Sequence, residues 1–212
     1  MHSATPLLLE GLKRMEYRGY DSAGVAVMNG SGVETRKAVG KISQLERALV
    51  ASPVEGDMGI GHTRWATHGV PNECNAHPHI DCNGDIAVVH NGQLTNYHMW
   101  RRRLERKGHR FQSECDSEII AVYLAQKMDD GLSLETAMKQ SLDELDGVFT
   151  YLVVTADALG MAKDEMAAKP LVLFESPSLV ALASEEVAIR AVIGHEIDTY
   201  DPYEREVLVW HR

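Results

Sequence analysis

The chain has 212 residues, and its 21 lysines and arginines are outnumbered by 31 aspartates and glutamates, which gives a formal net charge of −10. A negative balance of this size argues against nucleic acid and against an anionic membrane surface as partners. No apolar run approaches the length of a membrane span, and the first residues lack the basic region of a signal peptide. With only three cysteines, we expect a cytoplasmic protein with reduced thiols.

The first half of the chain predicts a helix, a hairpin, a second helix and two strands, in this order. Leu8, Leu12 and Met15 recur on one helical face, and Pro6 suits the first turn of such a helix. Glycine-rich residues 29–32 separate two runs of strand-forming residues, which is typical of a hairpin. The predicted segments are a helix over 6–17, a hairpin over 25–40, a helix over 41–51, and strands over 59–67 and 84–92.

The stretch VVHNGQLTNY, residues 88–97, joins a predicted strand to a predicted helix. An Asn-Gly pair usually marks a hairpin, but the residues after Asn91-Gly92 do not alternate like a second strand. Instead, Tyr97, Trp100 and Leu104 recur three and four positions apart, as in a helix. We therefore expect Asn91 and Gly92 at a strand-to-helix corner, where backbone N–H groups are exposed and a ligand can approach closely.

The second half of the chain predicts two helices, four short strands, a short helix and a closing strand. Asp116 and Ser133 are expected to cap the two helices. The predicted ranges are helices over 116–128 and 133–145, strands over 148–157, 159–164, 170–176 and 179–184, a helix over 184–194 and a strand over 205–212. No repeat or linker interrupts the chain. We expect one α+β domain over residues 1–212, with layers of sheet covered by helices.

The region from Gly61 to Gly92 is rich in histidine and cysteine, so a metal site has to be considered. Cys74, His77, His79 and Cys82 form a C-x2-H-x-H-x2-C pattern, whose thiolates and imidazoles could satisfy tetrahedral zinc. Zinc modules, however, usually pair their ligands across a longer insert, and the Pro between the two histidines is stiff. We favour hydrogen-bonded loop histidines and small apolar cysteines, and expect no metal.

The same region also offers the groups needed to bind a small zwitterion. The planar fork of Arg64 suits bidentate capture of a carboxylate, and Asp116 could hold an ammonium group. The side-chain amide of Asn91 and the backbone N–H of Gly92 could form an oxyanion hole. Each residue also has a simpler role: a salt bridge for Arg64, a cap for Asp116 and a turn for Asn91-Gly92. Together they suggest a site for an amino-acid amide.

Several long motifs run through the chain. They are LLLEGLKRMEYRGYDSAGVAV, GIGHTRWATHGVPNECNAHPH, IAVVHNGQLTN and SECDSEII, followed by DGVFTYLVVTAD and KPLVLFESPSLVALASEEVAIRAV. These motifs resemble those of the glutaminase domain of class II glutamine amidotransferases. The first three are especially similar to glucosamine-6-phosphate synthase, and the later part, from residue 146 onwards, is more similar to the amidotransferase subunit of multi-subunit glutamate synthases.

The resemblance implies an N-terminal-nucleophile hydrolase fold, a four-layer αββα sandwich, without a cofactor. It implies hydrolysis of L-glutamine to glutamate and ammonia, which passes to a synthase domain or subunit. In the family an N-terminal Cys supplies the thiol nucleophile, and its α-amine is the base. The implied roles are an oxyanion hole from Asn91 and Gly92, a carboxylate site at Arg64, an ammonium site at Asp116, pocket walls from Trp65, Thr67 and His68, and support from Arg18 and Asp21.

The start of the chain departs from the family pattern, because Met1-His2 stands where the family has a strand that begins Cys-Gly-Ile. Cys74, Cys82 and Cys115 cannot supply a thiol and a free amine together. Three explanations are open: a Cys encoded just upstream, a degenerate relative that binds glutamine without hydrolysing it, or a strand from another chain. We favour the first, because the pocket residues are retained. We expect little glutaminase activity from these 212 residues, and an architecture that lacks its first strand.

Overall fold

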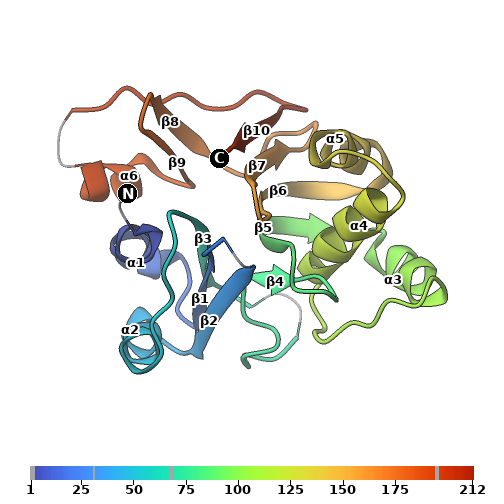
Figure 1. The fold of residues 1–212 in the computed structure, drawn as a ribbon, viewed down its shortest axis with the longest axis horizontal. Coiled ribbons are helices and arrows are strands. Elements are labelled where there is room, and N and C mark those ends of the chain that lie inside the picture. The colour runs from blue at the N-terminus through green and yellow to red at the C-terminus, as the bar shows by residue number, and fades with distance from the viewer. Residues whose placement is uncertain (1–2, 31, 67–68, 194–195) are drawn as a thin grey trace.

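Two β-sheets lie face to face in the middle of the protein, and helices cover both outer faces (Figure 1). The computed structural model describes residues 3–30, 32–66, 69–193 and 196–212. The first sheet has the strand order β2-β1-β3, the second has the order β10-β7-β6-β5-β4, and β8 pairs with β9. The strands are β1 Ser22–Met28, β2 Val33–Val39, β3 Met58–Arg64, β4 His79–Ile80, β5 Ala87–Leu94, β6 Gly147–Val154, β7 Ala158–Lys163, β8 Val172–Ser176, β9 Leu179–Ala183 and β10 Val207–His211.

Helices α1 (Ala4–Met15) and α2 (Ile42–Ala51) cover the outer face of the first sheet. Each has one apolar stripe, and the buried Leu12, Leu45 and Val25 belong to the core between these helices and β1. All seven residues of β1 are buried, because this strand lies between β2 and β3 and between two layers. A short 3-10 helix, Glu16–Arg18, follows α1.

Helices α3 (Tyr97–Arg106), α4 (Ser117–Asp129) and α5 (Leu134–Glu144) cover the outer face of the larger sheet. The first nine residues of α4 are all buried, since this helix lies between the sheet and its neighbours. Side chains from the two sheets meet in a separate inner core that includes Met28, Ile60 and Val89. The last helix, α6 (Glu186–Ile193), packs against α1. The layers are therefore helix, sheet, sheet and helix.

The predicted helices and strands are largely confirmed, but one expected corner is wrong and one strand was missed. The hairpin forms with Met28 opposite Val33, and the hydroxyl of Ser133 accepts the N–H of Thr136 as a helix cap. The corner expected at Asn91-Gly92 is wrong, because β5 continues to Leu94 and both residues pair inside the sheet. The sequence pattern also missed β4, which has only two residues. None of the helices in the described part of the chain is long and apolar enough to cross a membrane.

Candidate active site

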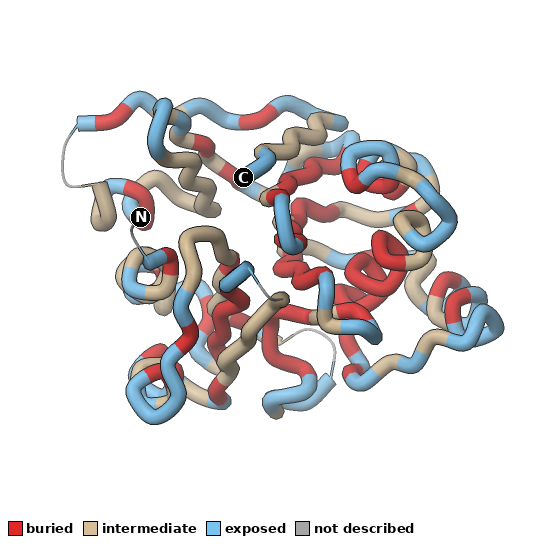
Figure 2. The backbone as a smooth tube through the Cα atoms, viewed as in Figure 1, coloured by how far each residue is buried: buried red, intermediate tan, exposed pale blue. Residues whose placement is uncertain are grey.

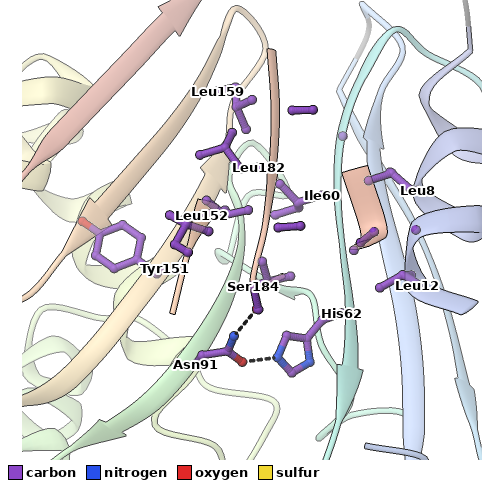
Figure 3. A pocket seen from close by; sticks show the side chains of 18 of the residues that line it. Leu8, Leu12, Ile60, His62, Asn91, Tyr151, Leu152, Leu159, Leu182 and Ser184 are labelled. Carbon is purple, nitrogen blue, oxygen red and sulfur yellow. Dashed lines mark hydrogen bonds between the residues drawn. The ribbon is translucent and has the colours of Figure 1, made fainter. Parts of the chain in front are cut away.

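A cavity of about 610 Å³ lies between the two sheets, where α1, β3, β5, β6 and β9 approach one another. Its two ends differ in chemistry (Figure 3). One end is lined by leucines and isoleucine, among them Leu8, Ile60 and Leu182. The other end holds most of the predicted site residues, with His62: Arg64, Trp65, Asn91, Gly92 and Asp116. An ion pair between Arg212 and Asp57, which directly precedes β3, also lines the cavity. Apart from Asp21, every described residue that the sequence assigned to the pocket lines this cavity.

Two strand edges face the cavity. In the described residues, β3 is an edge strand of its sheet, and all of Met58–Arg64 lines the cavity. The whole of Leu179–Ala183, which is β9, lines it as well. Neither strand is as buried as β1: β9 is partly exposed along its full length, and most of β3 is too (Figure 2). The cavity therefore borders unpaired backbone on both strands.

Arg64, the last residue of β3, lies opposite Ser22 of β1, so the sheet register fixes its backbone. Its side chain is 4% exposed, one guanidinium nitrogen lies 3.5 Å from the thiol of Cys115, and another lies 3.9 Å from the carboxylate of Asp21. That carboxylate also accepts the backbone N–H of Ala66. Asp21 therefore holds Arg64 and the start of the next loop together from outside the cavity.

Asn91 is held by two hydrogen bonds that fix its orientation (Figure 3). The Nε2 atom of His62 lies 2.9 Å from the side-chain oxygen of Asn91 and donates to it. The amide nitrogen of Asn91 then faces Ser184 and donates to its hydroxyl over 3.0 Å. Because a side-chain amide has two N–H groups, the second remains available toward the cavity. Neither His62 nor Ser184 was singled out from the sequence.

Gly92 occupies a backbone conformation that only glycine adopts readily. Its φ is +134°, and a Cβ atom placed on it would lie 2.0 Å from the carbonyl oxygen of Val148 on β6. The close approach of β5 to β6 therefore requires glycine here. The Asn-Gly pair that suggested a turn instead marks a distortion inside a strand.

Asp116 precedes α4, but its carboxylate does not cap that helix. It accepts the backbone N–H of Leu94 over 2.8 Å, and the residue is 4% exposed. The expected cap is therefore wrong: the side chain turns back to the end of β5. This bond ties the start of α4 to the strand that carries Asn91 and Gly92.

The remaining predicted residues lie around the rim. Arg18 forms an ion pair with Glu185 and lines the cavity. Trp65 is 63% exposed and packs edge-on against Tyr20, with ring centroids 5.8 Å apart. Thr67 and His68, also assigned to the pocket, lie outside the residues that the structure describes.

Comparisons with known proteins show the family to which the chain belongs. The sequence profile described as "Glutamine amidotransferase domain" matches residues 62–191, which is more than half of the chain. The chain is a class II glutamine amidotransferase domain. Its solved neighbours include the glutamine phosphoribosylpyrophosphate amidotransferase of B. subtilis, with a TM-score of 0.82, 28% identity, and coverage of 96% of this chain and 44% of that one. The N-terminal-nucleophile hydrolase fold expected from the motifs is confirmed.

The curated relatives of this amidotransferase domain include glutamine–fructose-6-phosphate aminotransferases (isomerizing). The protein of Pseudomonas syringae pv. tomato is 45% identical over 189 residues, covering 89% of this chain and 31% of the relative. The protein of Thermococcus kodakarensis is 39% identical, with coverage of 96% and 37%. The chain thus spans about a third of the length of these relatives. They support the resemblance to glucosamine-6-phosphate synthase more than that to glutamate synthase.

Histidines surround the polar end of the amidotransferase cavity: His77, His79 and His90 are buried, and His62 is partly buried. The rings of His62 and His77 stack with centroids 4.2 Å apart, and His77 meets His79 edge-on at 4.7 Å. A serine hydroxyl, that of Ser117, lies between His77 and His90 at 3.2 and 2.9 Å. Burial lowers the pKa of His62, and it lowers the pKa values of His77 and His79 well below 6.5. These three rings are therefore neutral at pH 7.

The zinc pattern does not form a metal site in the described residues. His77 and His79 are buried, whereas Cys74 and Cys82 are exposed. The thiol of Cys82 instead faces His109 and the carbonyl of Arg110. No group of three or more potential ligands converges in the part of the chain that the structure describes. His77 contacts the rings of His62 and His79 and the hydroxyl of Ser117.

Proposed function

We propose that this domain hydrolyses L-glutamine to glutamate and ammonia and supplies the ammonia to a synthase. The observation that carries the proposal is the convergence of Arg64, Asn91, Gly92 and Asp116 on one cavity in a chain of the glutamine amidotransferase family. These residues come from β3, β5 and the start of α4, so only the fold brings them together.

The charges at the polar end complement a free amino acid. The buried guanidinium of Arg64 attracts an α-carboxylate, and the carboxylate of Asp116 attracts an α-ammonium group. The amide of Asn91 and the N–H of Gly92 then donate hydrogen bonds to the oxygen of the glutamine side-chain amide as this oxygen becomes negative. Trp65, Thr67 and His68 complete the walls in this proposal, and Arg18 and Asp21 support the site.

The thiols of these 212 residues do not suit the role of nucleophile. Burial raises the pKa of Cys115 to about 11, which keeps it protonated beside Arg64. Cys74 and Cys82 are exposed and do not line the cavity. In this proposal the nucleophile is an N-terminal Cys on a segment joined ahead of α1, and the 212 residues without it have little glutaminase activity.

The cavity offers a place for such a segment. The N–H of Ala4 donates to the carbonyl of Gly56 over 2.6 Å, so α1 begins beside the Met58 end of β3. The polar groups lie at the Arg64 end of the same strand. An extended segment that runs along β3 rises ~3.3 Å per residue, so about six residues reach from Ala4 to the polar end. Its first residue would then face Asn91 and Gly92.

The test compares three polypeptides: the 212 residues, the same residues with a Cys-Gly-Ile strand segment joined ahead, and a Ser-Gly-Ile version. Ammonia release from L-glutamine is measured for each, and binding of L-glutamine is measured by calorimetry. We expect the Cys version to exceed both others by about a thousandfold or more, because removing the nucleophile of a covalent mechanism costs several powers of ten.

Two other outcomes are informative. Binding of L-glutamine without ammonia release from the Cys version would favour an inactive glutamine-binding or regulatory subunit. Failure of every version to bind L-glutamine would contradict the proposal.

The relatives suggest the wider context of the domain. We propose that residues 1–212 act as one cytoplasmic glutaminase unit, and that the ammonia acceptor is a sugar-phosphate synthase of the glucosamine-6-phosphate synthase type. The similarity to glutamine–fructose-6-phosphate aminotransferases over 89–99% of the chain supports this acceptor over a glutamate synthase. Ammonia transfer to fructose 6-phosphate by the longer protein, measured against free ammonia, tests it.

A further inference from the structure

An exposed cysteine outside the cavity faces a histidine that is itself held in place. Cys82 follows β4, and its sulfur lies 3.7 Å from the Nδ1 atom of His109. The same sulfur lies 3.3 Å from the carbonyl oxygen of Arg110. A thiol next to an imidazole nitrogen is the arrangement that produces a reactive thiolate, provided that this nitrogen carries no proton.

The neighbouring residues on α4 determine which nitrogen of His109 carries the proton. The Nε2 atom of His109 lies 2.8 Å from the side-chain oxygen of Gln126. The amide nitrogen of Gln126 donates to Asp130 over 2.9 Å, which fixes the orientation of the amide. Its oxygen must then accept the Nε2–H of His109. The Nδ1 atom is consequently the proton acceptor, and it faces the sulfur of Cys82.

The segment that contacts Cys82 through His109 and Arg110 is basic, although the chain as a whole is acidic and Asp81 precedes Cys82 directly. Residues 101–110 contain five arginines and one lysine against a single glutamate. One of these cations, Lys107, pairs with Asp130 next to Gln126. Positive charge on this segment attracts small anions.

We propose that Cys82, His109 and Gln126 form a thiol-exchange site that takes small anionic disulfides. The thiol proton passes to Nδ1 of His109, and the thiolate attacks one sulfur of the disulfide. A new bond joins Cys82 to that sulfur while the original disulfide bond breaks. The second sulfur leaves as a thiolate and takes the proton from His109. Cys82 is thereby oxidised to a mixed disulfide, and the reagent is reduced to one thiol.

The chain contains its own matched controls. Cys74 is exposed as well, but it has no hydrogen-bond partner among the described residues. Cys115 is buried, and its pKa is raised to about 11, so it serves as the unreactive reference. A difference in reaction rate between Cys82 and Cys74 reports on the effect of His109 and Gln126, because both thiols belong to the same folded molecule.

The experiment uses the 212-residue chain at pH 7 with dithiobis(nitrobenzoate), an anionic aromatic disulfide. Released thiol is followed by absorbance, and Cys74→Ser and Cys82→Ser variants assign each kinetic phase. We expect Cys82 to react at least about tenfold faster than Cys74, since His109 can accept the thiol proton and the basic segment attracts the anionic reagent. The dication cystamine should show a smaller preference for Cys82.

Three substitutions at two positions test the mechanism. His109→Gln should lower the rate at Cys82 to that of Cys74 and leave the rate at Cys74 unchanged. Gln126→Glu keeps the acceptor for His109 and should retain the fast rate, whereas Gln126→Ala should slow it. A Cys115 that stays unreactive shows that each variant is folded, because this thiol is buried. Equal rates at Cys82 and Cys74 in the unchanged protein, or a fast rate that survives His109→Gln, would overturn the proposal.

Discussion

The two ends of the cavity are built in different ways. At the polar end, each side chain is held by a partner from another element: Arg64 by Asp21, Asn91 by His62 and Ser184. At the apolar end, Ile60 is buried, but Leu182 and most of the two edge strands are only partly covered (Figure 2). The side chains at the polar end are therefore fixed by hydrogen bonds and ion pairs, whereas those at the apolar end are only partly packed.

The two ends are therefore suited to different tasks: the polar end to binding the substrate, and the apolar end to accepting a further segment of chain. A polar group must be fixed before substrate arrives, because an oxyanion site that reorganises during reaction loses most of its advantage. An apolar surface beside free strand edges is instead suited to accept an extended segment, which pairs through its backbone. The comparison predicts that substitutions at the polar end strongly reduce stability or glutamine binding, and that substitutions at the apolar end reduce stability only slightly.

The largest effect is expected from Gly92→Ala. The new methyl would meet the carbonyl oxygen of Val148 at 2.0 Å, and φ is +134°. We expect a loss of about 3 kcal/mol in the free energy of unfolding, measured with urea. Gly84→Ala is the control, since φ is +81° but no atom lies within 4 Å, and it should cost only about 1 kcal/mol. Similar costs at both positions would show that β5 can relax.

Arg64→Ala is expected to abolish most of the glutamine binding. Loss of a buried charge-assisted contact weakens the affinity by about 100-fold, or roughly 2.7 kcal/mol. Calorimetry with L-glutamine measures the change, and Arg14→Ala on the exposed side of α1 is the control. Arg64→Lys keeps the charge without the fork and should recover part of the affinity. Unchanged binding of L-glutamine in Arg64→Ala would show that Arg64 does not bind the α-carboxylate.

Local sequence patterns predicted most elements, because the spacing of apolar residues in helices and strands is visible within a short stretch of sequence. The helix that Ser133 caps is an example, since its cap bond spans three residues. The same reasoning misplaced Asn91-Gly92, because a positive φ inside a strand depends on β6, which lies more than fifty residues further on. Turn statistics carry no information about such a partner.

The site could be predicted only in part. Arg64 and Asn91 were found through the motifs and through their chemistry. His62 had an overlooked signal, because it lies two residues before Arg64 and therefore on the same face of β3. Ser184 had no such signal, since its partner Asn91 is 93 residues away. Long-range hydrogen bonds of this kind become visible only when the sheets are assembled.

Lowering the pH should decrease the free energy of unfolding because of the histidines that surround the polar end of the cavity. The pKa values of His62, His77 and His79 are lowered on folding, so the unfolded chain binds more protons below its own histidine value of about 6.5. Their stabilising effect is therefore fully present above pH ~6.5 and is lost as the pH falls below it, by up to about 1.4 kcal/mol per pH unit for each histidine.

Urea unfolding between pH 7 and pH 5 measures this loss. The variant His77→Gln removes one of the three groups and should reduce the slope by about 1.4 kcal/mol per pH unit, whatever its effect on absolute stability. A pH-independent free energy of unfolding over this range would mean that the rings titrate normally in the folded protein.

The smallest effect is expected at the apolar end, from Leu182→Ala. Leu182 lies opposite Leu173 in the register of β8 and β9, so the two leucines share one sheet and differ in burial. Leu173 is 0% exposed, and its replacement by Ala should cost about 3 kcal/mol. Leu182 is partly exposed and lines the cavity, so its replacement should cost only about 1 kcal/mol. Equal costs would mean that the apolar end is already packed. A Cys-Gly-Ile segment joined ahead of α1 could fill this end. The cost of Leu182→Ala should then rise toward that of Leu173→Ala, because removing the Leu182 side chain would leave a hole in a packed core rather than widen an open cavity.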